Sequence, residues 1–198
     1  MVMPESTQVG EEAHDEETSI DLLCARIVGE CRQGDRSRFG ELLALTEPRV
    51  RRLIGRLAGV DDLDDLVQET YLRAWRSLAT FRGESRFSTW LFRIAVNATL
   101  TWRRSRKPSV SLPIDAEQTI PDTRTLDDHS IFRAYENALA NLSLDLRTIF
   151  VLHEAEGLSY LEIAETVGCP MGTVMSRLHR ARTKILDELR ERLEELTP

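Results

Sequence analysis

The stretch GLSYLEIAETVGCPMGTVMSRLHRAR, from Gly157 to Arg182, decides the fold class of this chain. Ser159 with Glu162 three residues later is the signature of a capping box, which predicts the start of a helix. Residues 168–170, Gly-Cys-Pro, predict a tight turn, and a second helix is expected from there to about residue 193. Two helices joined by such a turn form a helix-turn-helix, whose second helix fits the major groove of DNA.

The second helix of this motif has two distinct faces. At about 100° per residue, the apolar side chains fall on one inner face, which comprises Val174, Leu178, Ala181 and Ile185. Short polar and basic side chains suit base edges, and basic residues at the rim suit phosphates. The outer face and its rim therefore predict a DNA contact made by Gly172, Thr173, Ser176, Arg177, His179, Arg180 and Thr183.

The charge of the chain is unevenly distributed. The 198 residues carry a formal net charge of −7, but residues 32–107 alone carry +7, while residues 1–31, 108–130 and 131–198 are all acidic. Because phosphate neutralisation supplies most of the affinity for DNA, this balance predicts weak DNA binding by the chain alone.

The composition excludes several classes of protein. Three cysteines with no C-x-x-C pair predict neither a disulfide framework nor a zinc site, and no other metal or cofactor is expected. No apolar run approaches the roughly 20 residues that span a bilayer, and the acidic N-terminus does not resemble a signal peptide. We therefore expect a cytoplasmic protein without membrane insertion.

The hydrophobic periodicity predicts an all-α protein with two small helical domains joined by a flexible linker. We expect a disordered acidic tail at 1–18, a first domain at 19–106, an acidic linker at 107–129 and the helix-turn-helix domain at 130–198. The expected helices span residues 20–31, 35–46, 48–58, 62–78, 89–104, 131–141, 144–155, 160–167 and 171–193, with Pro48 at the start of the third and Ser88 capping the fifth.

A second block with nucleic-acid character, FRGESRFSTWLFRIAVN, spans Phe81 to Asn97. Arginines can grip phosphates, aromatic rings can stack on unpaired bases, and an amide can read a base edge. This block therefore predicts contact with opened DNA by Phe81, Arg82, Arg86, Trp90, Arg93 and Asn97. Phe81 is the best stacking candidate because it lies in a loop, whereas Phe87, Trp90 and Phe92 also fit a hydrophobic core.

The helix between these blocks has an outer face that mixes acids with an apolar residue. Opposite its apolar stripe we expect Asp65, Gln68, Glu69 and Leu72. Acids repel DNA, and an exposed leucine among charges favours a protein partner over a merely solvated face.

The segments Asp65–Trp75, Phe81–Asn97, Gly157–Ala164 and Gly172–Leu178 together resemble the extracytoplasmic-function sigma factors of bacterial RNA polymerase. The resemblance covers residues 20–195. It implies that Asp65, Gln68 and Glu69 bind the β′ coiled coil of core polymerase, and that the C-terminal domain meets the β flap.

The resemblance also implies that residues 81–97 melt the −10 promoter element, with Phe81 and Asn97 at a pocket for a flipped base, and that the helix-turn-helix reads the −35 element. An anti-sigma factor and a response to stress or envelope signals are further expectations. Met175 stands where the family often has arginine or lysine, which leaves one −35 contact undetermined.

Two other functions fit the sequence less well. A stand-alone helix-turn-helix regulator would leave residues 81–97 unexplained and would need a dimer seam. An enzyme is disfavoured, because no nucleophile–base set, phosphate loop or paired catalytic carboxylates are recognisable.

Overall fold

The computed structural model describes residues 8–33, 35–59, 61–105 and 126–196, and all of the regular structure in these ranges is helical. The prediction of an all-α chain is therefore confirmed for the described residues. The helices are α1 (Gln8–Arg32), α2 (Phe39–Ala58), α3 (Leu63–Ser77), α4 (Phe87–Ser105), α5 (Leu126–Asn141), α6 (Leu144–Phe150), α7 (Tyr160–Val167) and α8 (Met171–Leu196). Short turns at Arg36–Arg38, Leu78–Thr80 and Val151–Ala155 complete the order, the last being a π-type continuation of α6.

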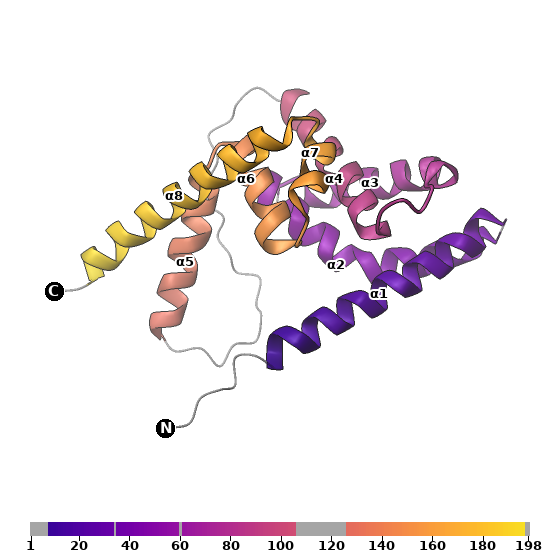
Figure 1. The fold of residues 1–198 in the computed structure, drawn as a ribbon, viewed down its shortest axis with the longest axis horizontal. Helices are drawn as coiled ribbons and strands as arrows, with labels where there is room; N and C mark the ends of the chain where they lie inside the picture. Colours follow the sequence, from indigo (N-terminus) through magenta and orange to yellow (C-terminus); the bar gives the residue numbers. More distant parts are fainter. Residues whose placement is uncertain (1–7, 34, 60, 106–125, 197–198) are drawn as a thin grey trace.

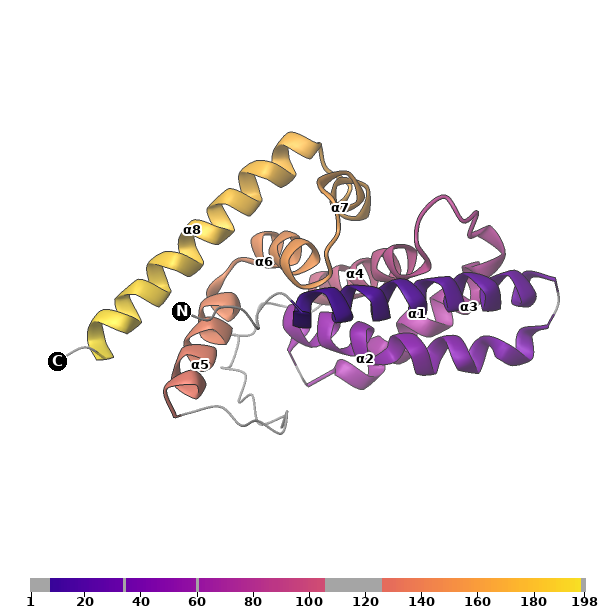
Figure 2. The same cartoon turned by 60° about the horizontal axis from the view of Figure 1, so that its bottom comes forward.

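The helices form two modules (Figure 1). The N-terminal module, α1–α4, packs α2 against α1, α3 and α4, and the C-terminal module, α5–α8, packs α5, α6 and α7 against the long α8. Figure 2 shows α6 and α7 between α8 and the N-terminal module. The buried apolar residues of both modules belong to one continuous cluster, so the modules pack directly against each other.

Helix α2 corrects the prediction of two helices broken at Pro48. A proline inside a helix removes one backbone hydrogen bond, normally made to the residue four positions earlier, here Ala44. Both Pro48 and Ala44 are exposed, so water can bind the released carbonyl. The buried face continues on both sides of the proline, from Leu42 to Leu57, and its packing keeps the helix in one piece.

Three helix starts also differ from the prediction. Helix α1 begins at Gln8, so the predicted disordered tail is helical from that residue on, and α5 begins at Leu126, inside the predicted linker. The remainder of the linker, residues 107–125, lies outside the described residues. Helix α4 begins at Phe87, and Ser88 is a buried residue of its first turn rather than its cap.

Candidate nucleic-acid and protein interfaces

The helix-turn-helix forms as the sequence predicts. The backbone N–H and the hydroxyl of Ser159 donate to a carboxylate oxygen of Glu162 over 2.9 and 2.8 Å, and the N–H of Glu162 donates back to the Ser159 hydroxyl over 3.3 Å. This reciprocal pattern confirms the capping box. Gly168 ends α7 in the left-handed region at a φ of 68°, where a side chain would be strained, and so redirects the chain into α8.

The buried face of α8 is the predicted one, since Val174, Leu178, Ala181 and Ile185 are all at most 4% exposed. Five predicted DNA-contacting residues are exposed on the outer face: Gly172, Ser176, His179, Arg180 and Thr183. Thr173 and Arg177 are half-buried.

Two arginines of α8 face their own module. The guanidinium of Arg177 lies 3.3 Å from a carboxylate oxygen of Asp145, and that of Arg182 lies 2.6 Å from Glu154. These pairs orient α8 on α6 and the π turn. Arg180 makes no ion pair with the part of the chain that the structure describes, so its charge faces solvent and is available for DNA.

The loop before α4 and the start of α4 form an aromatic cluster. The ring of Phe81 is 6% exposed and lies 5.7 Å from Phe87 and 5.3 Å from Trp90, between ring centroids. Phe81 also lines a hollow of about 550 Å³ between this loop and α1, beside the exposed Arg86. In this conformation Phe81 is therefore part of the aromatic core and not an exposed stacking platform, contrary to the expectation from its loop position.

The expected pairing of Phe81 with Asn97 at one pocket is not present. Asn97 is exposed on α4 but does not line the hollow that Phe81 lines. It lies ten residues after Phe87, about 15 Å along the helix axis. Arg82 is exposed, Trp90 is half-buried, and Arg93 lies on the Asn97 side of α4, one turn earlier.

The outer face of α3 borders an apolar groove. Asp65, Gln68 and Leu72 are exposed, the last by 42%, and the half-buried Glu69 pairs with Arg73 over 2.7 Å. A groove of about 670 Å³ runs beside them between α2 and α3, lined on its apolar side by Phe39, Leu43, Val67, Tyr71, Leu72 and Trp75. The sequence pattern of α3 alone could not show this groove, because half of it comes from α2.

The contact between the modules also includes polar pairs that were not predicted. The guanidinium of Arg49 lies 3.2 Å from Glu156, with side chains 14% and 4% exposed. Arg93 pairs with Glu165 over 2.8 Å, and the Thr89 hydroxyl donates to Glu162 over 3.1 Å. Helix α7 therefore lies along α4 and occupies Arg93, one of the predicted −10 residues.

Burial shapes the electrostatics of this contact. Desolvation raises the pKa of Glu156, and the positive charge of Arg49 opposes that rise. Arg147, also buried, has carbonyl partners: it donates to Ala140 and Leu142 in its own module and to Arg56 of α2. Desolvation lowers the pKa of this guanidinium, with Arg103 adding to the effect.

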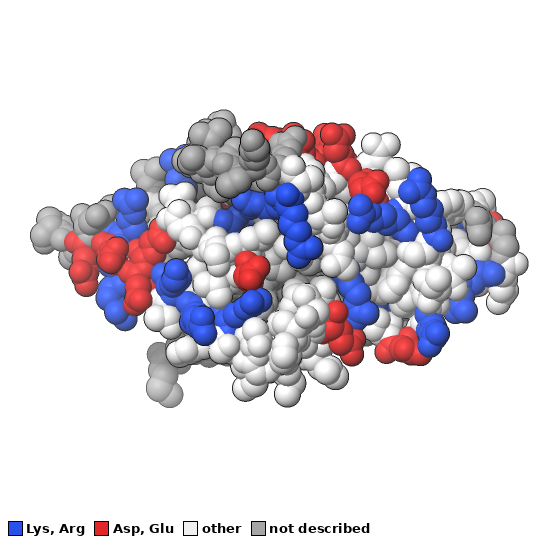
Figure 3. Space-filling view, turned by 90° about the horizontal axis from the view of Figure 1, so that it is seen from above, with Lys and Arg blue, Asp and Glu red and all other residues white. Residues whose placement is uncertain are grey.

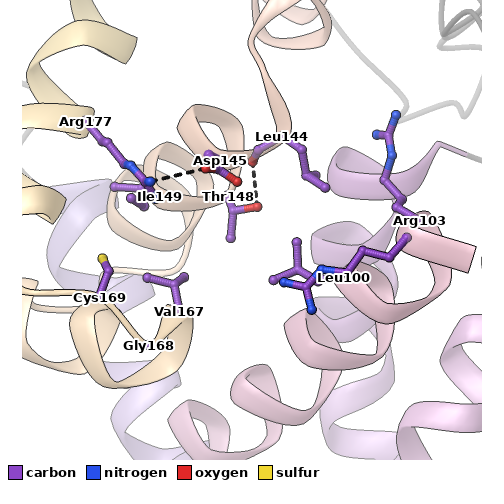
Figure 4. A pocket seen from close by; sticks show the side chains of 11 residues that line it. Leu100, Arg103, Leu144, Asp145, Thr148, Ile149, Val167, Gly168, Cys169 and Arg177 are labelled. Carbon is purple, nitrogen blue, oxygen red and sulfur yellow. Dashed lines mark hydrogen bonds and ion pairs between the residues drawn. The ribbon is translucent and has the colours of Figure 1, made fainter. Parts of the chain in front are cut away.

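A hollow of about 580 Å³ interrupts the contact between the modules (Figure 4). Figure 4 shows Leu100 and Arg103 of α4 opposite Thr148 of α6, with Arg177 reaching to Asp145 at the side of α8. On either side of this hollow the modules pack directly, through α7 on α4 and through α2 on α6 near Arg49 and Arg147.

The surface as a whole is not uniformly basic. In the view of Figure 3, basic and acidic side chains alternate, and acids gather toward the end where α8 finishes. In the described ranges no three His, Cys, Asp or Glu side chains are grouped as a metal site would require, and no helix has the length and apolarity to cross a membrane.

Known proteins are similar to this chain in sequence. The family model described as Sigma-70 region 2 matches residues 42–108, and the one described as Sigma-70, region 4 matches residues 132–185. The sigma-E factor of Haemophilus influenzae, named an extracytoplasmic-function RNA polymerase sigma factor, is 39% identical over 176 residues, covering 82% of this chain and 93% of that protein. The sigma-E factor of Escherichia coli K12 is 37% identical over 176 residues, covering 80% of this chain and 90% of that protein.

Two solved structures are similar in fold. The sigma factor RpoE from Bartonella quintana, in complex with the anti-sigma factor NepR, matches with a TM-score of 0.63 at 29% identity, covering 77% of this chain and 96% of that one. CnrH, in complex with the cytosolic domain of CnrY, matches with a TM-score of 0.62 at 25% identity, covering 83% of this chain and 96% of that one.

Proposed function

This chain belongs to the extracytoplasmic-function sigma factors of the sigma-70 family, and from that premise we propose which of its surfaces binds core RNA polymerase and which bind the two promoter elements. Directing promoter-specific transcription initiation is the function of this family, and initiation factors are not themselves catalysts. The observation that supports the assignment is that three surfaces occur together on one chain. These are the recognition helix of a helix-turn-helix, a helix rich in arginines and aromatic residues, and a helix face that mixes acidic and apolar side chains.

The −35 element is assigned to the outer face of α8. Its exposed side chains are short or basic, and the recognition helix of a helix-turn-helix presents such residues to the major groove. Arg180 is the strongest candidate for a specific contact, because its charge faces solvent. Arg177 and Arg182, paired with Asp145 and Glu154, serve mainly to hold α8 in place.

The −10 element is assigned to α4 and the preceding loop. Arg82 and Arg86 are exposed near the hollow that Phe81 lines, and this hollow suits an extruded base. Asn97 and Arg93 lie further along α4 and would contact a different part of the strand. Stacking by Phe81 requires its ring to leave the cluster with Phe87 and Trp90.

Core polymerase is assigned to the α3 face and its groove. An apolar centre with a charged rim is the composition of a protein–protein interface. Here Leu72 and Trp75 line the groove with Gln68 beside them, and Asp65 and Glu69 lie on the adjoining outer face of α3. The partner implied is the β′ coiled coil, with the β flap meeting the C-terminal module. The protein acts where polymerase and promoters are, in the cytoplasm.

An anti-sigma factor completes the set of partners. Both similar solved structures are complexes, one with an anti-sigma factor and one with the cytosolic domain of CnrY. We expect release from such a partner to follow stress or an envelope signal. Contact of Arg93 with a phosphate would compete with its ion pair to Glu165, so we expect promoter binding to loosen the packing of α7 on α4.

Association with core polymerase tests this proposal against a stand-alone regulator. Purified protein is mixed with core polymerase from the same organism, with and without a competing sigma factor, and run on a sizing column. The proposal predicts co-elution that the competitor displaces. Free protein that never co-elutes, yet binds a DNA site by itself at physiological salt, would instead indicate a stand-alone regulator.

A further inference from the structure

The N-terminal end of α8 exposes two methionines. Met171 and Met175 are each 51% exposed, although four other apolar residues of this helix are buried almost completely. Exposed apolar side chains are common in proteins, but these lie on the part of a recognition helix that contacts base edges. Their position, and not their exposure alone, calls for an explanation.

The side chain of Met175 lies among small neighbours on the surface of α8. It follows the buried Val174 by one residue, so its side chain leaves the helix about 100° from the core-facing direction. Gly172 has no side chain, and the hydroxyl of Ser176 donates to the carbonyl of Thr173 over 3.1 Å, close to its own helix. The thioether therefore has small neighbours at Gly172 and Ser176 and is exposed to a molecule that binds this side of α8.

No charged side chain accompanies it. The first six residues of α8, Met171 to Ser176, are uncharged. The first arginine, Arg177, is half-buried and paired with Asp145, and Arg182, on the same side of α8 as Met175, is paired with Glu154. The guanidinium groups of Arg177 and Arg182 thus already have acidic partners in their own module, with which a guanine would have to compete.

The chemistry of base recognition indicates which base Met175 can contact. Guanine is read in the major groove by arginine or lysine donating to O6 and N7, whereas an apolar side chain meets the C5-methyl group of thymine. A thioether has no donor and is only a weak acceptor, and it adapts well to irregular apolar surfaces.

We propose that Met175 is a specificity-determining residue that contacts the methyl group of a thymine in the −35 element. The element would then carry an A·T pair at the position where a basic residue in place of Met175 would select G·C. This inference rests on the proposed function and gives the base class that α8 selects. The contact buries about one methyl group, which corresponds to roughly a fourfold change in affinity.

The test uses the holoenzyme, assembled from core polymerase and the full chain. A duplex promoter library randomised across the −35 element is selected with wild-type protein, Met175→Ala and Met175→Arg. The matched control is Leu186→Ala, which removes another exposed apolar residue of α8 about 16 Å further along the helix. Each thymine of the selected element is then replaced singly by deoxyuridine, which lacks only the methyl group.

We expect the wild type and Leu186→Ala to select a thymine at one position, and deoxyuridine there to weaken binding three- to fourfold. Met175→Ala should lose both the selection and the deoxyuridine effect, and Met175→Arg should shift the position toward guanine. If wild type selects an element whose thymines all tolerate deoxyuridine, or if Met175→Ala leaves the preference unchanged, the inference is overturned while the proposed function stands. If no −35 preference emerges with any variant, the proposed function fails as well.

Discussion

At the scale of single residues, Glu162 serves two parts of the structure. It closes the capping box of α7 with Ser159, and it accepts a hydrogen bond from Thr89 of α4. Desolvation acts to raise the pKa of its carboxyl group, but these hydrogen bonds outweigh it and the pKa lies below its usual value of 4.5. A carboxylate with a depressed pKa stabilises the fold above its unfolded pKa and loses that contribution as the pH falls through its folded pKa.

We therefore expect Glu162→Gln to lower the free energy of unfolding by about 1 kcal/mol at pH 7, as the loss of a helix cap does. The difference from the wild type should shrink below pH 4.5, where the wild-type carboxylate becomes protonated. Urea unfolding at pH values from 7 to 3 measures this, with Glu165→Gln as a control that keeps the cap. If the two free energies of unfolding differ by the same amount from pH 7 to pH 3, the charge of Glu162 does not contribute to stability.

At the scale of elements, the sequence predicts best where local signals agree. The helix-turn-helix combines a capping box, a left-handed glycine and a clear apolar stripe, and both its helices begin where expected. The predicted break at Pro48 was wrong, because the tertiary packing of α2 outweighs one lost backbone hydrogen bond. The burial of Phe81 and the groove between α2 and α3 depend on residues distant in sequence, which local patterns do not contain.

The face of α3 should matter for partner binding and not for folding. Asp65→Lys with Glu69→Lys should abolish association with core polymerase, because two charges at the rim are inverted. Unfolding should change by about 0.5 kcal/mol or less, since Asp65 is exposed and Glu69 makes only a solvent-accessible pair with Arg73. Asp187→Lys with Glu191→Lys, on the exposed end of α8, is the matched control. If the α3 variant still binds core polymerase like the control, the assigned face is wrong.

Substitutions in α4 and in α8 should impair different steps of initiation. Asn97→Ala should impair promoter opening, because an amide that contacts a separated strand acts only after unstacking has cost a few kcal/mol. Arg180→Ala should weaken duplex recognition, by about 1–3 kcal/mol if it reads a base. Transcription from closed and premelted −10 templates separates the two.

A premelted −10 region should rescue Asn97→Ala and leave Arg180→Ala impaired. Rescue of both variants to the same extent, or of neither, would contradict the division of labour between α4 and α8.

At the scale of the whole molecule, the contact between the modules includes a buried ion pair between Arg49 and Glu156. Removing one partner of such a pair leaves an uncompensated charge and typically costs 3–5 kcal/mol. Arg49→Glu would place a second carboxylate directly beside the buried Glu156. Burial already disfavours the charged form of Glu156, and the substitution replaces its positive partner with a like charge. We expect the modules to separate, which small-angle X-ray scattering would detect as a larger radius of gyration.

Two further variants make this prediction specific. Arg51→Glu, on the same helix, breaks only exposed pairs with Glu47 and Asp64 and should leave the radius unchanged. Arg49→Glu combined with Glu156→Arg should restore compactness in part. An unchanged radius in Arg49→Glu alone would mean that other contacts hold the modules together.

Transcription of total genomic DNA shows whether this chain directs core polymerase to promoters with two elements. Core polymerase is incubated with fragmented DNA from the same organism, with and without the protein, and the 5′ ends of the transcripts are sequenced. We expect discrete start sites that appear only with the protein and share a −35 and a −10 element at constant spacing. Absence of discrete starts, from a core polymerase that initiates normally with its housekeeping sigma factor, would contradict this function.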